Sequence, residues 1–95
     1  MAQKPVALVT GSSSGVGAAC VEQLAKAGWD VVVNYSRSAE AAEAVAERCR
    51  AAGAEVLLQQ ADVADDSACR ALVAAVEARF GRLDALVNNA GTTKF

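Results

Sequence analysis

Residues 6–17 read V-A-L-V-T-G-S-S-S-G-V-G, a short apolar run followed at once by a turn rich in glycine and serine. The apolar run at 6–10 predicts a buried β-strand, and the apolar spacing that begins at Gly17 predicts a helix. A turn between a strand and a helix presents free backbone N–H groups at the positive end of the helix dipole. The stretch therefore predicts a phosphate-binding turn, and a loop without a ligand is the alternative.

Each glycine of this turn has its own expected role. Gly11 permits a tight turn as the strand ends, Gly15 leaves room for a phosphate, and Gly17 lets the helix lie close to the strand. The spacing is G-x-x-x-G-x-G, and no G-K-S or G-K-T follows it. The turn therefore differs from the P-loop of nucleotide triphosphate-binding proteins.

The rest of the chain continues the alternation of strand and helix. Apolar runs predict further strands at 31–35, 55–60 and 85–88. Apolar residues at helical spacing predict three helices, the second capped by Ser36 or Ser38 and the third opened by residues 65–67. The residues predicted on the inner faces of these helices are Gly17, Cys20, Val21, Leu24, Ala25 and Gly28; Ala42, Val45, Ala46, Cys49 and Ala52; and Cys69, Leu72, Val73, Val76 and Phe80.

This order, β-α-β-α-β-α-β, predicts an α/β fold with right-handed crossovers and a parallel sheet. The strands are apolar throughout rather than alternating, as expected when helices cover both faces of a sheet. The sequence therefore predicts a doubly wound sheet with strand order 3-2-1-4.

Composition excludes several classes of protein. The 95 residues are 54% hydrophobic with mean hydropathy +0.24, which excludes a disordered chain. The net charge of −2 gives no basic excess, so no nucleic-acid partner is expected. No apolar run approaches the roughly 18 residues of a membrane span, and no signal peptide is recognisable, so no membrane partner is expected. Histidine is absent, which excludes Ser-His-Asp and Cys-His mechanisms within these residues.

The three cysteines are Cys20, Cys49 and Cys69, and none belongs to a C-x-x-C pair. An odd number without paired spacing predicts neither a disulfide framework nor a zinc site. All three fall on predicted inner helix faces, where we interpret them as small core residues. Free cysteines fit a reducing, cytoplasmic location, and no metal site is expected.

Three motifs, in order along the chain, resemble the short-chain dehydrogenase/reductase family. The turn at 10–17 matches the family's T-G-x-x-x-G-x-G, Asp62-Val63 follows the third predicted strand, and Asn88-Asn89-Ala90-Gly91 matches its N-N-A-G. The resemblance covers essentially the whole chain and extends to 3-oxoacyl-(acyl carrier protein) reductase-like members. It implies that residues 1–95 are the N-terminal part of a single Rossmann-like dinucleotide-binding domain. It also implies hydride transfer between a nicotinamide cofactor and a carbonyl or alcohol substrate, in a homodimer or homotetramer.

The resemblance assigns roles to the motif residues. Thr10 and Asn89 would hydrogen-bond and lock together the ends of the first and fourth strands. Asp62 would accept a hydrogen bond from the adenine amino group, with a turn-forming acid as its alternative, and Asn88 would be a buried, satisfied amide. The remaining residues implied to bind the cofactor are Gly11, Ser13, Ser14, Gly15, Val16 and Gly17 around the phosphates and ribose, Val63 through its backbone, and Asn89, Ala90 and Gly91 beside the adenosine.

The end of the second predicted strand bears on the choice between NAD and NADP. NAD enzymes of this architecture usually place an acid there, but residues 34–38 read N-Y-S-R-S, and Asp30 stands at the opposite end. Arg37, with Tyr35, Ser36 and Ser38, is therefore predicted to bind the 2′-phosphate of NADP. Similar strings occur in NADP-dependent members, including some 3-oxoacyl-(acyl carrier protein) reductases and pteridine reductases. NAD is the alternative, because Ser14 stands where many NADP members carry Arg or Lys, and Arg37 would then be a solvated loop charge.

The family's catalytic Y-x-x-x-K pair is absent from these residues. Tyr35 is the only tyrosine, and Ala39 stands four residues after it. We therefore assign no catalytic residue here, and we expect the catalytic residues, the substrate pocket and a strand beside residues 85–88 in a continuation beyond Phe95. Two other functions stay open: a nucleotide-binding module without catalysis, and a Rossmann-like enzyme of another class, such as a methyltransferase.

Overall fold

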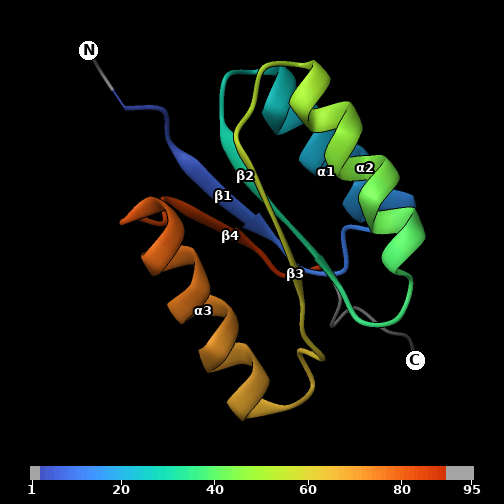
Figure 1. Ribbon diagram of the computed structural model, residues 1–95, viewed down its shortest axis with the longest axis vertical. Coiled ribbons are helices and arrows are strands. Elements are labelled where there is room, and N and C mark those ends of the chain that lie inside the picture. Colours follow the sequence, from blue (N-terminus) through green and yellow to red (C-terminus); the bar gives the residue numbers. More distant parts are fainter. Residues whose placement is uncertain (1–2, 90–95) are drawn as a thin grey trace.

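The computed structural model describes residues 3–89, in which strands and helices alternate without exception (Figure 1). The elements are β1 (Val6–Val9), α1 (Gly15–Lys26), β2 (Asp30–Tyr35), α2 (Ala39–Ala51), β3 (Val56–Gln60), α3 (Asp66–Phe80) and β4 (Ala85–Val87). Every predicted element is present, with boundaries that differ by one or two residues. The main difference is that α1 begins at Gly15, so that the last glycines of the turn form the first turn of the helix.

The four strands form one parallel sheet in the order β3-β2-β1-β4, which confirms the predicted topology. Leu8 of β1 lies beside Val32 of β2 on one side and Leu86 of β4 on the other. Helices α1 and α2 cover one face of the sheet and α3 covers the opposite face (Figure 1). All strands run in the same direction, so their carboxyl ends meet at one end of the sheet. We call this the carboxyl end and the opposite one the amino end.

Neighbouring residues of each strand supply two separate cores. Val31 and Val33 of β2 pack against α1 and α2, while Val32 between them packs against α3. All three side chains are fully buried, which explains why the strand sequences are apolar without alternation. Burying three β-branched side chains of this size contributes about 1.5–3 kcal/mol each relative to leaving them in water.

Most residues predicted on the inner helix faces are buried or half-buried, but three are exposed. Gly28 and Ala52 lie just past the ends of α1 and α2, where the chain has already left the helix face. Val73 is 41% exposed because it lies on the part of α3 near β4, an edge strand of the described sheet. Burial of Val73 was therefore predicted wrongly from the helical period alone.

Some of the predicted helix caps are present and one is not. Asp65 caps α3 by accepting hydrogen bonds from the backbone N–H groups of Ser67 and Ala68. Ser38 occupies the N-cap position of α2, but its side chain makes no capping hydrogen bond, so that predicted interaction is wrong. The chain turns at Gly81 with φ 74°, a left-handed conformation that glycine adopts without strain.

Cys49 is buried against α1, and Cys20 and Cys69 are half-buried, which agrees with their interpretation as core residues. Burial raises the pKa of the Cys49 thiol to about 11, so this side chain is a poor nucleophile at neutral pH. Among residues 3–89, no helix combines the length and apolar character needed to span a membrane.

Candidate functional site

The carboxyl end of the sheet contains a hollow of about 350 Å³. Its walls come from the turn after β1, the end of β2, the loop after β3 and the residue after β4. The lining residues are Gly11, Asn34, Ser36, Ala61, Asp62, Val63, Ala64 and Asn88. The structure thus brings together parts of all the segments that carry the sequence motifs, at the position where open α/β sheets bind ligands.

The glycine turn has the backbone that its sequence predicts. Gly11 and Gly15 have φ values of 61° and 59°, in the left-handed region that residues with a Cβ rarely adopt. A Cβ at Gly17 would overlap the carbonyl oxygen of Gly11 and lie 2.7 Å from Nδ2 of Asn89. Gly17 is therefore required by close approach, but to the turn and Asn89 rather than to the strand that was predicted.

The first turn of α1 has hydrogen-bonding capacity that is not used within residues 3–89. The backbone N–H of Ala18 donates to Ser14, and the three N–H groups before it have no acceptor within the helix. Ser14 stands at the N-cap position, but its side chain makes no capping hydrogen bond. A Cβ placed on Gly15 would meet no atom within 4 Å. This end of the helix is thus open, electropositive and sterically accessible.

The predicted link between the ends of β1 and β4 is present. The backbone N–H of Asn89 donates to Thr10 Oγ1 at 2.9 Å, and Asn89 Nδ2 donates to the Gly11 carbonyl at 3.1 Å. Thr10 Oγ1 in turn donates to Oδ1 of Asn88 at 3.2 Å. Asn88 was predicted to be buried, but it is exposed, because it follows β4, an edge strand of the described sheet, and lines the hollow.

Arg37 and Asp62, two of the charged side chains at this end, make few contacts within residues 3–89. Arg37 is exposed in the turn between β2 and α2, and its guanidinium makes no ion pair or hydrogen bond within residues 3–89. Asp62 Oδ1 accepts from the backbone N–H of Ala64 at 3.0 Å, which is the turn-forming role considered as an alternative. Its second carboxylate oxygen has no partner in the described part of the chain, so this local role leaves an acceptor available.

The other predicted site residues lie around these two. Tyr35 is half-buried and packs on the core formed with α1 and α2, and Val63 is half-buried on the α3 side. Ser36 is exposed, and its carbonyl oxygen accepts from Gln60 Nε2 at 3.0 Å. The predicted contacts of Ala90 and Gly91 lie outside the described residues.

Sequence reasoning missed two residues of this end of the sheet, Ser12 and Asn34. Both are buried, and they hydrogen-bond to each other and to the turn. The available signal was a polar side chain at position 34 directly after three valines, inside a strand that is otherwise apolar.

Comparison with known protein families gives a match over nearly the whole chain: the family model for the short chain dehydrogenase matches residues 5–95. An uncharacterized oxidoreductase of Methylorubrum extorquens is 51% identical over 90 residues, which are 95% of this chain and 36% of that protein. The 3-oxoacyl-(acyl-carrier-protein) reductase of Staphylococcus aureus is 49% identical over 88 residues, or 93% and 36%.

Solved structures agree with this match. A short-chain dehydrogenase/reductase from Serratia marcescens superposes with a TM-score of 0.88 at 47% identity, covering 92% of this chain and 36% of that one. A protein from Burkholderia cenocepacia, solved with bound NADP, gives 0.85 at 33% identity over 90% and 33% of the two chains. The chain thus spans about a third of the length of the relatives that it matches.

Proposed function

The chain belongs to the short chain dehydrogenase family, and we propose that it binds NADP as part of an oxidoreductase that acts on a carbonyl or alcohol substrate. When bound, the nicotinamide supplies the hydride that a carbonyl accepts, or accepts the hydride that an alcohol gives up. The observation that carries the proposal is that three kinds of group without a partner in residues 3–89 lie at the same end of the sheet. They are N–H groups at the start of α1, the Arg37 guanidinium and one oxygen of the Asp62 carboxylate.

The phosphate groups fit the turn after β1. The N–H groups at the start of α1 need an acceptor, and a pyrophosphate provides several anionic oxygens. Gly15 leaves the approach open, because a Cβ there would meet nothing within 4 Å. In this proposal Gly11, Ser13, Ser14, Val16 and Gly17 surround the same groups.

The adenosine fits the hollow between the turn and the loop after β3. Asp62 offers the carboxylate oxygen that its own turn does not use, and an adenine amino group is a donor that it can bind. The backbone of Val63 and the residues after β4, Asn89, Ala90 and Gly91, complete this side of the proposed site. Hydrogen bonds at the adenine and at the 2′-phosphate, the two ends of the adenosine portion, then fix the orientation of the cofactor.

The 2′-phosphate is assigned to Arg37, with Tyr35, Ser36 and Ser38 around it. No carboxylate of residues 34–38 competes for the guanidinium or repels the phosphate. A charge-assisted hydrogen bond of this type contributes about 1.5–3 kcal/mol. The assignment favours NADP over NAD, which carries a hydroxyl at the same position.

The similarity to a 3-oxoacyl-(acyl-carrier-protein) reductase supports a carbonyl compound as the substrate. We also propose a homo-oligomer, as the family resemblance implies. The cytoplasmic location inferred from the cysteines stays a prediction.

The activity is tested by mixing the full-length protein with NADPH and a series of carbonyl compounds, 3-oxoacyl thioesters among them, and following the loss of NADPH absorbance. We expect turnover with at least one of these compounds. Tight NADPH binding without any turnover would favour a nucleotide-binding module instead. Binding of S-adenosylmethionine in place of NADPH would favour a Rossmann-like enzyme of another class.

A further inference from the structure

The buried polar side chains described by the structure all lie at the carboxyl end of the sheet. They are Thr10, Ser12 and Asn34, at 5%, 0% and 1% exposure, and no other polar side chain of residues 3–89 is buried to this degree. Burying an amide or hydroxyl without partners costs about 1–3 kcal/mol, so each of these groups needs hydrogen bonds. Asn34 has the most connections of the three.

The Asn34 side chain joins two segments that are far apart in the sequence. Its Oδ1 accepts from the backbone N–H of Gly11 at 2.9 Å. Its Nδ2 donates to the carbonyl oxygens of Gln59 and Ala61, each at 3.3 Å. These partners fix the orientation of the amide. If it were flipped, its NH₂ would meet the Gly11 N–H and its oxygen would meet the carbonyl oxygens of Gln59 and Ala61, so no hydrogen bond could form.

The backbone of Asn34 is tied to the same turn. The Ser12 N–H donates to the Asn34 carbonyl at 2.9 Å, and the Asn34 N–H donates to Ser12 Oγ at 2.9 Å. Ser12 Oγ then donates its own proton to the Val9 carbonyl at 2.7 Å. The beginning of the glycine turn is therefore held to β2 by three hydrogen bonds that all involve Asn34.

The two segments joined by Asn34 are opposite walls of the hollow. Gly11 opens the turn at which we place the phosphates, and Ala61 directly precedes Asp62, at which we place the adenine. A neutral carboxamide provides an acceptor on one side and two donors on the other. Aspartate, leucine and valine have similar sizes but do not provide this combination. One side chain thus contacts both walls, beside the backbone hydrogen bonds that join Ser12 to Asn34 and Ala61 to Tyr35.

We propose that Asn34 is a positioning residue for the cofactor, a role that rests on the function proposed above. It holds the glycine turn and the Asp62 loop at the separation that the adenosine half of the cofactor requires. Asn34 does not itself bind the cofactor, because both amide hydrogens are already donated and the side chain is 1% exposed. Its contribution passes through Gly11 and Asp62.

The test compares Asn34→Ala with Val45→Ala in the full-length protein. Val45 of α2 is 1% exposed in the core that packs on the same sheet, and it does not line the hollow. Its truncation therefore controls for lost stability of the fold without changing the two walls. For each variant, the dissociation constant for adenosine 2′,5′-bisphosphate and the thermal midpoint are measured. We expect Asn34→Ala to weaken binding of this probe about tenfold or more, and Val45→Ala to leave it within about twofold.

Equal affinity of the folded Asn34→Ala and Val45→Ala proteins would overturn the positioning role while leaving the proposed function intact. Failure of the unmodified protein to bind the probe, NADPH or NADH would overturn both. If Asn34→Ala does not fold, Asn34→Asp decides. A protonated aspartic acid keeps the acceptor for Gly11 and regains one donor, so its affinity relative to the unmodified protein should rise as the pH falls. A ratio independent of pH would contradict the proposal.

Discussion

The two ends of the sheet have hollows of similar size but use their polar groups in opposite ways. The hollow at the amino end is about 310 Å³, and the one at the carboxyl end is about 350 Å³. At the amino end, charged side chains bind one another. At the carboxyl end, the buried neutral side chains of Ser12 and Asn34 hold the backbone, while the Arg37 guanidinium and one oxygen of Asp62 have no partner within residues 3–89. The volumes therefore do not distinguish the two ends, whereas hydrogen-bonding capacity unused within residues 3–89 favours the carboxyl end as the proposed site.

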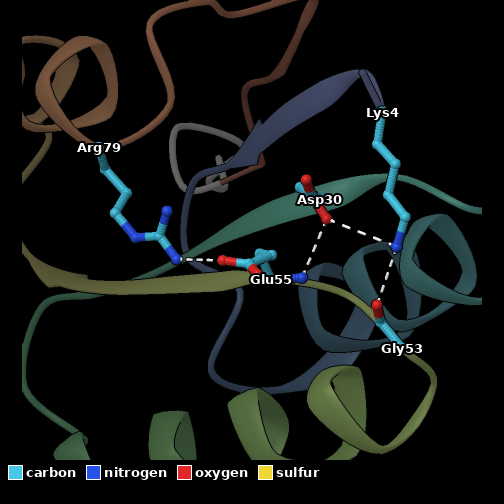
Figure 2. A network of polar contacts seen from close by, with 5 residues as sticks. All are labelled: Lys4, Asp30, Gly53, Glu55 and Arg79. Carbon is cyan, nitrogen blue, oxygen red and sulfur yellow. Dashed lines mark hydrogen bonds and ion pairs between the residues drawn. The ribbon is translucent and has the colours of Figure 1, made fainter. Parts of the chain in front are cut away.

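Figure 2 shows the amino end, where five residues form one network; they come from the segment before β1, from β2, from the loop between α2 and β3, and from α3. Lys4 Nζ lies 3.8 Å from Asp30 Oδ1 and donates to the Gly53 carbonyl at 2.9 Å. Asp30 accepts from the backbone N–H of Glu55, whose carboxylate binds Arg79 at 2.5 Å. Each charge drawn in this network has an opposite charge as its partner.

A second group at the amino end repeats this arrangement. Asp84 accepts from the Val6 N–H at 2.8 Å and pairs with Arg82 through both carboxylate oxygens, at 2.7 and 2.8 Å. Asp84 and Asp30 therefore each satisfy a backbone N–H at or just before the start of a strand. The carboxylates of the amino end act as structural acceptors, which leaves little affinity for a ligand.

The largest effect is expected at Gly17, where the turn, α1 and Asn89 meet. Gly17→Val places side-chain atoms on the Gly11 carbonyl and on Asn89 Nδ2, so we expect a loss of stability of about 3 kcal/mol or more. Gly15→Asn is the matched control, because its site is open and asparagine tolerates a φ of 59° better than most residues. It should melt close to the unmodified protein but bind NADPH poorly. Thermal melts and cofactor titrations of both variants measure this, and equal stability of the Gly17→Val protein would refute the close-approach argument.

The next effect concerns Arg37 at the carboxyl end. Arg37→Ala removes the proposed 2′-phosphate ligand, so NADPH binding should weaken by about 1.5–3 kcal/mol while NADH binding stays nearly constant. Stability should not change, because the guanidinium has no partner within residues 3–89. Arg48→Ala removes the ion pair with Glu22 between α2 and α1, away from the proposed site. It controls for the effect of losing one positive charge elsewhere in the protein. Equal losses of affinity for NADPH and NADH would show that Arg37 does not bind the 2′-phosphate.

The smallest effect is expected from acid at the amino end. The hydrogen bond from Arg79 lowers the pKa of Glu55, and the hydrogen bonds from Arg82 and then Val6 lower the pKa of Asp84. Because the folded pKa lies below the unfolded one, both groups stabilise the fold above the usual carboxyl range, near pH 4, and this contribution is lost as the pH falls through it. Solvent screening keeps the effect modest.

Melting temperatures between pH 6 and 3 measure this loss. We expect a shallower decline for Arg79→Ala and Arg82→Ala than for the unmodified protein. Arg70→Ala is the control, since the Arg70–Asp66 pair is about 80% exposed on both sides. Identical pH profiles for all four proteins would mean that the ion pairs of the amino end do not stabilise the fold.

The topology and the glycine turn could be predicted because they depend on neighbouring residues. The turn at 10–17, the apolar strands and the periodic helices each carry their signal within a few positions of the sequence. The Thr10–Asn89 link was also predicted, but from the family resemblance rather than from local pattern.

The connections across the sheet could not be predicted in this way. The hydrogen-bond partners of Asn34 lie 22 to 27 residues away from it. Gly53 lies 49 residues from Lys4, and Val6 lies 78 residues from Asp84, so these contacts form only once the strands are in register. Val73 was misplaced for a related reason, because its burial depends on what lies beside β4 and not on the helical period of α3.

The central claim is that Arg37, whose guanidinium has no partner within residues 3–89, selects NADP over NAD. The most direct test is the ratio of the dissociation constants of the unmodified full-length protein for NADPH and NADH, measured under the same ionic conditions. We predict that NADPH binds about ten times more tightly or better, as expected for one charge-assisted hydrogen bond to the 2′-phosphate. Equal affinities, or tighter binding of NADH, would contradict the account.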